Sequence, residues 1–202
     1  MAVFLCLKRS GGFVIPAAAG FLVSVAACAF RTFFLYSHRL VPYSFIENFI
    51  FYSGQSVLPP VILYGIYMIV ARDSKETKNL AFFPLTASFY SVFLPYTVIS
   101  GAAAGSYTVF DAVTKPLLYL SELVLCAELI PLAGEEADLG RKITAAAAVA
   151  LSVISTTLPV AAESLYMTRT APSLCTVLCA VCICAPLAAV AVRIMTYKKT
   201  ES

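Results

Sequence analysis

The chain has 202 residues, of which 60% are hydrophobic and only 12% are charged, with a formal net charge of +3. Soluble domains average about 45–50% apolar and about 25% charged residues, and one of this size buries only about 70% of the surface exposed by its unfolded chain. The composition excludes a soluble globular domain, a disordered tail, a coiled coil, a collagen and a disulfide-stapled secreted domain. It predicts an all-α protein in a lipid bilayer.

A membrane-spanning helix needs about 20 mostly apolar residues. Six such runs, separated by short linkers, occupy residues 13–36, 49–71, 80–100, 113–133, 143–162 and 173–196. None alternates apolar and polar residues in the way that a membrane β-strand does. The sequence therefore predicts a polytopic bundle of six transmembrane helices that forms one domain over residues 1–202.

Small residues spaced four apart mark the first span. Gly20, Ser24 and Cys28 form a ridge on which another helix can pack closely. The segment from Val25 to Cys28 also resembles a bacterial lipoprotein cleavage box. We favour the interpretation of an intact span with Cys28 as a packing residue, because the apolar run is long for a signal and five further spans anchor the chain.

The second span contains an interruption. Ser44 and Glu47 fit a capping box, which predicts the start of a helix. The sequence Ser53-Gly54-Gln55-Ser56 and the pair Pro59-Pro60 then break the run, and residues 61–71 reach only about 16 Å, too short to cross alone. Transporter sites are often built on such breaks, which makes Gln55 a candidate ligand contact. The alternative is a packing kink.

The fourth span carries an ionisable residue, Glu122, near its midpoint, where a charge costs roughly 2.5–3.5 kcal/mol. Lys115, Tyr119, Glu122 and Cys126 follow helical spacing on one face. We expect Lys115 to approach Glu122 through the Tyr119 hydroxyl or a water. Two roles stay open for Glu122: a solute-binding or proton-coupling carboxylate, or a protonated side chain that hydrogen-bonds another helix.

The last two spans carry further small residues. Thr144, Ala148, Ser152 and Thr156 form a ridge in the fifth span, and Cys175, Cys179 and Cys182 share one face of the sixth. Three thiols can form a soft-metal site, but a tetrahedral site usually combines paired CxxC units joined by a loop. We therefore expect these cysteines to pack helices and to bind no metal.

The distribution of Lys and Arg predicts the orientation, because cytoplasmic loops carry the excess. With the N-terminus inside, ten of these residues lie on the inner side and four on the outer side, namely Arg31, Arg39, Lys115 and Arg169. Both termini are therefore predicted to face the cytoplasm of a cell with an inner membrane. The positive charge marks topology, so we expect no nucleic-acid partner.

The predicted outer ends of the spans are rich in tyrosines and charges, including Arg31 and Glu163. We expect an outward-facing cup, closed by loops at residues 37–43 and 101–105, that suits a small organic ligand. Enzyme chemistry has little support. His38 is the only histidine, and no HExxH, GxSxG or phosphate-loop motif occurs, so we expect no enzymatic activity and no cofactor.

Six spans in about 200 residues, cytoplasmic ends and an outer cup resemble the substrate-binding subunits of energy-coupling-factor vitamin transporters. The resemblance is architectural, and no motif carries it. It implies a solute-binding subunit that captures a small molecule from outside and needs a partner for energised uptake. In that family alanines four apart in the first span pack on the partner; here the ridge Gly20, Ser24 and Cys28 stands in that place and departs from the alanine pattern.

The candidate lining residues of the solute route are Glu122, Lys115, Tyr119, Gln55, Arg31 and Glu163. The outline is also similar to the rod-shape membrane subunits of cell-wall elongation complexes. That likeness implies a structural or assembly protein whose intramembrane polar residues only pack helices, and it stays open as the alternative.

Overall fold

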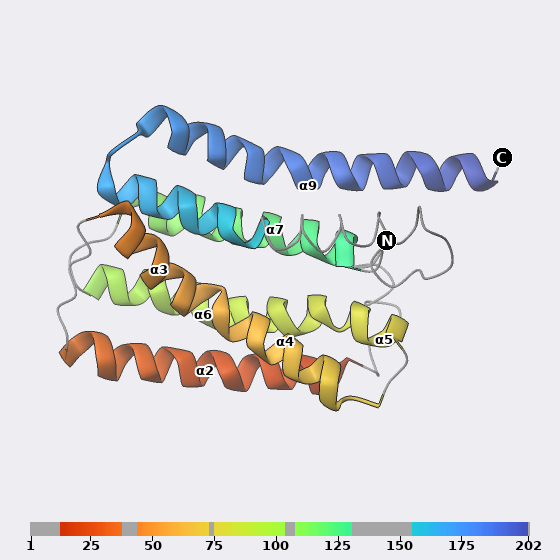
Figure 1. Cartoon of the computed structure of the whole chain (residues 1–202), viewed down its shortest axis with the longest axis horizontal. Helices are drawn as coiled ribbons and strands as arrows, with labels where there is room; N and C mark the ends of the chain where they lie inside the picture. The colour runs from red at the N-terminus through yellow and green to blue at the C-terminus, as the bar shows by residue number, and fades with distance from the viewer. Residues whose placement is uncertain (1–12, 38–43, 73–74, 104–107, 131–154, 202) are drawn as a thin grey trace.

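A computed structural model of the chain describes residues 13–37, 44–72, 75–103, 108–130 and 155–201. In these residues the fold is all helical, as predicted, and successive segments run in opposite directions along one long axis (Figure 1). The helices are α2 (Val14–Ser37), α3 (Phe45–Ser56), α4 (Leu58–Val70), α5 (Lys75–Leu80), α6 (Phe82–Ala103), the π-helix η2 (Phe110–Thr114), α7 (Lys115–Leu129), a helix over residues 155–168 and α9 (Pro172–Glu201).

Three helical stretches of the described residues are long and apolar enough to cross a membrane: Val14–Phe33, Thr77–Ser100 and Pro172–Ala191. The bent pair α3–α4 makes a fourth if it counts as one span. Only 22% of the first stretch and 17% of the third are buried within the chain, so α2 and α9 turn most of their apolar surface outward. An apolar outer surface of this kind suits lipid. The count of six spans and the cytoplasmic placement of the termini remain predictions.

Three predicted segments differ from the helices observed. The fourth span corresponds to η2 and α7, which are continuous from Phe110 to Leu129 but contain four charged residues, Asp111, Lys115, Glu122 and Glu128. The helix in the fifth span continues to residue 168, beyond the predicted end at 162, while residues 131–154 lie outside the described residues. Residues 101–103, expected in a loop, extend α6, whereas residues 38–43 of the first loop are not among those described.

The break in the second span is confirmed, and its cause is local. The capping box at Ser44 and Glu47 starts α3, and α3 meets α4 at Val57 with a bend of 45°. Proline has no backbone N–H. Pro59 and Pro60 therefore cannot donate to the carbonyls of the residues four positions earlier, and the helical ladder opens where the chain turns.

The small-residue ridge of α2 is covered by α6 of the same chain. A Cβ atom added at Gly20 would overlap the backbone carbonyl of Leu85, and Ser24 and Cys28 are buried. Cys28 belongs to an apolar cluster with Phe89 of α6, as the packing interpretation of this cysteine requires. Helix α6 therefore covers the ridge that was expected to receive a partner subunit. The two backbones can approach so closely because Gly20 has no side chain.

On the other side of the bundle, α9 packs against η2, α7 and the helix over residues 155–168. One apolar cluster joins Leu118 of α7, Ala162 of the helix over residues 155–168, and Cys182 of α9. The Cys175 thiol donates to the carbonyl of Ala162 at 3.4 Å. These cysteines fill space between helices, and the contacts fix the depth of α7 relative to α9.

Candidate functional site

A buried ion pair joins α7 to the helix over residues 155–168. The Lys115 ammonium lies 2.5 Å from Oε1 of Glu163, and the two residues are only 5% and 3% exposed. The ammonium also lies 5.5 Å from the centre of the Tyr52 ring, a cation–π geometry that favours the charged amine. Each charge therefore has a partner inside an apolar bundle, which is the condition for burying either one.

The pair is extended into a network that reaches the break in the second span. The Tyr119 hydroxyl donates to Oε2 of Glu163 at 3.1 Å and lies 2.9 Å from the hydroxyl of Ser56, the last residue of α3. The Tyr90 hydroxyl of α6 donates to the carbonyl of Ser56 at 3.3 Å. This is the carbonyl that Pro60 leaves without a helical donor, so α6 supplies the hydrogen bond that the break removes.

The predicted approach of Lys115 to Glu122 is wrong. The two residues share a face of α7, but the ammonium binds Glu163, which belongs to another helix and lies 48 positions later. A direct pair within one helix would need the ammonium to reach across two turns. Glu163 instead faces Lys115 across the helix interface, and the Tyr119 hydroxyl bonds to the same carboxylate.

Glu122 lies one turn beyond Tyr119 and has a different environment. The residue is only 5% exposed, and Oε1 accepts a weak hydrogen bond from the Cys126 thiol at 3.6 Å. The Cys126 sulfur in turn lies 3.2 Å from Oγ of Ser155. Among the described residues, Oε2 of Glu122 has no hydrogen-bond partner. Burial of such a polar atom is costly unless something binds it.

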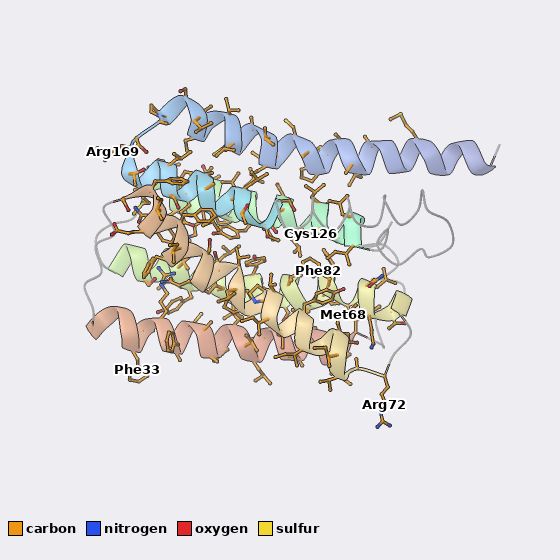
Figure 2. The ribbon with its side chains drawn as sticks, in the orientation of Figure 1. Phe33, Met68, Arg72, Phe82, Cys126 and Arg169 are labelled. Atoms are coloured by element: carbon orange, nitrogen blue, oxygen red, sulfur yellow. The ribbon has the colours of Figure 1, made fainter. Side chains whose placement is uncertain are left out.

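A cavity of about 660 Å³ opens beside Cys126, between the bend of α3–α4, the start of α6, α7 and residues 156–157. Figure 2 labels three of its lining residues, Met68, Phe82 and Cys126, in the region between α4, α6 and α7. Its walls are mostly apolar, with a few polar groups. Two of them, the hydroxyls of Ser53 and Tyr64, are buried without a hydrogen-bond partner among the described residues. This combination is typical of small-molecule sites.

The six candidate lining residues divide into three places. Lys115, Tyr119 and Glu163 meet in the network, and Glu122 lies on α7 next to Cys126. Gln55 sits at the end of α3, with a buried Oε1 that has no partner in the described part of the chain.

Arg31 lies apart from these residues. Its guanidinium is about 6 Å from the ring centres of Phe93 and Tyr96, at the α2–α6 interface. None of the six candidates is among the residues that line the cavity.

Sequence reasoning missed two residues of the site, Tyr90 and Ser155, and one backbone group, the Ser56 carbonyl. A signal existed for the last, because a proline at position 60 frees the carbonyl at position 56. No local signal pointed to Tyr90 or Ser155, whose roles depend on which helices are neighbours.

Comparison with known proteins adds no relative: no protein-family model, curated protein or solved structure matches this chain.

Proposed function

We propose that this chain is an integral membrane solute-binding or transporter subunit that captures a small molecule from the outer side. Energised uptake then needs a partner, because the sequence contains no nucleotide-binding loop. The observation that supports this best is the 660 Å³ cavity at the bend of the second span, whose lining residue Cys126 also contacts the buried carboxyl group of Glu122. Broken helices that line a cavity are a recurrent basis of transporter sites.

The polar face of α7 offers a route to that cavity. It runs from Lys115, at the predicted outer end, through Tyr119 and Glu122 to Cys126, which lines the cavity. The eleven steps from Lys115 to Cys126 cover about 16 Å of helix. All four side chains are buried against neighbouring helices, so a solute that follows this face needs those helices to move apart.

A second function, that of a structural or assembly subunit, is favoured by one specific observation. The ion pair of Lys115 and Glu163 is satisfied within the chain, and Tyr119 and Ser56 complete it. Such a network needs no ligand, and it holds three helices together. In this alternative the cavity is a packing defect beside the bend.

Two glycines allow a matched test of the cavity. Gly54 lines the cavity and Gly65 does not, although both lie in the bent pair and a Cβ atom at either meets nothing within 4 Å. We expect Gly54→Leu to fill the cavity and Gly65→Leu to leave it open. The protein is purified from its own cells in mild detergent, and native mass spectrometry records retained small molecules and co-purifying subunits.

A molecule retained by the wild type and by Gly65→Leu, but lost from Gly54→Leu, would support the solute-binding function. Equal retention by both variants, or no retained molecule together with a stoichiometric morphogenetic protein partner, would favour the structural alternative. Circular dichroism of both variants controls for folding.

A further inference from the structure

We propose that the solute is an organic cation whose apolar body occupies the cavity and whose ammonium group binds Glu122. This inference rests on the proposed solute-binding function and adds the chemical class of the solute. Three observations carry it: the balance of buried charges, the position of Glu122 behind the cavity wall, and the chemistry of that wall.

The balance of buried ionisable groups leaves one carboxyl group without a basic partner. Among the charged residues whose side-chain burial the structure describes, the buried ones are Lys115, Glu122 and Glu163. Lys115 and Glu163 neutralise each other. Glu122 has only the Cys126 thiol, which is a weak donor, on one of its two oxygens. A bound cation supplies a countercharge for an ionised Glu122.

The position of Glu122 brings its carboxyl group close to the cavity wall, through the contact of Oε1 with the Cys126 thiol. Cys126 contacts the carboxyl group on one side and the cavity on the other, so a single thiol separates them. Cysteine is small, and its sulfur is held here by weak bonds to Glu122 and Ser155. A rotation of this side chain lets an ammonium group in the cavity approach the carboxylate, and charge-assisted bonds of that kind are roughly twice as strong as neutral ones.

The wall chemistry suits an apolar body with one polar end. Tyr64 and Phe82 form an edge-to-face pair, with ring centres 5.1 Å apart, and both line the cavity. The remaining wall combines aliphatic side chains with small polar ones such as Ser53 and Thr156. A volume of about 660 Å³ falls in the range of about 300–1,000 Å³ that holds drug-sized molecules. Aromatic faces also attract cations, so the same wall tolerates the charge during entry.

Two probes of matched length test the inference, 4-phenylbutylamine and 4-phenylbutan-1-ol, which differ in the ammonium group. The full chain is reconstituted in lipid nanodiscs, and binding is measured by native mass spectrometry and by the shift in the unfolding temperature. We expect the wild type to prefer the amine at least tenfold. Glu122→Gln should lose this preference, Glu122→Asp should keep part of it, and Glu47→Gln, at an exposed position, should keep all of it.

Each other outcome overturns the inference in a recognisable way. An amine preference that survives in Glu122→Gln would show that another group binds the cation. Equal binding of both probes, abolished by Gly54→Leu, would leave the solute-binding function standing and refute the cationic class. Binding of neither probe refutes the cationic class as well, while the retained-molecule experiment with the two glycine variants judges the proposed function separately.

Discussion

Removal of one partner from the buried ion pair should destabilise the bundle far more than removal of both. In Lys115→Met the Glu163 carboxylate keeps only the Tyr119 hydroxyl, and in Glu163→Gln the Lys115 ammonium stays buried without a countercharge. The double variant retains neither charge. A double-mutant cycle on these two positions therefore separates the mutual interaction from the burial of each group.

The magnitude follows from the geometry. At a separation of 2.5 Å, and with about 95% of each residue buried, the pair belongs to the class in which loss of one partner costs about 3–5 kcal/mol. The double variant keeps a neutral acceptor for Tyr119 and should lose about 1–2 kcal/mol, comparable with a buried hydrogen bond. The coupling energy between the two positions should therefore exceed about 3 kcal/mol.

The assay is the free energy of unfolding in mixed micelles, from reversible SDS titrations followed by circular dichroism. Lys78 provides the control. It belongs to α5, at the other end of the bundle (Figure 1), and its ammonium group donates to the Met68 carbonyl of α4 at 2.9 Å. Lys78→Met combined with Glu163→Gln should be additive within about 0.5 kcal/mol. A coupling energy below about 1 kcal/mol between Lys115 and Glu163 would refute the reasoning.

Three further predictions concern the backbone. Gly20→Ala should destabilise the bundle by about 1–3 kcal/mol, because its Cβ overlaps the Leu85 carbonyl, whereas Gly65→Ala has open space and should cost nothing in the same SDS titration. Pro60→Ala restores a donor for the Ser56 carbonyl and should reduce the 45° bend, measured as a longer distance between spin labels at the ends of α3 and α4; an unchanged distance would show that packing alone sets the bend. Arg169, in the turn before α9, has a φ of 53°, so Arg169→Gly should raise the free energy of unfolding by about 1 kcal/mol, and a loss would contradict strain at this turn.

Local features of the fold were predictable from the sequence. The apolar runs, the capping box at Ser44 and the break at Pro59-Pro60 each depend on residues within a turn or two, and helical periodicity placed Lys115, Tyr119, Glu122 and Cys126 on one buried face. These signals need no knowledge of neighbouring helices.

The pairing across helices was not predictable. Periodicity says which residues share a face but not what that face meets, so it suggested Glu122 as the partner of Lys115 and missed Glu163 in that role. The same limit applies to Gly20, whose ridge was evident while its neighbour, α6, was not. The cavity is harder still, because it depends on the joint packing of four segments and on none of them alone.

The apolar stretch of α9 also sets a depth scale for the charges. Its 20 residues, Pro172–Ala191, form a helix about 30 Å long, which matches the hydrocarbon thickness of a bilayer. Cys182, near the centre of this stretch, belongs to the same apolar cluster as Leu118 of α7. If α9 crosses the bilayer as predicted, the midplane passes close to Leu118, between Lys115 and Glu122. On the predicted topology, an organic cation that reaches Glu122 from outside would cross about two thirds of the membrane voltage, worth about 1.5 kcal/mol per 100 mV. Occupancy of the cavity should therefore rise when the cell interior is negative.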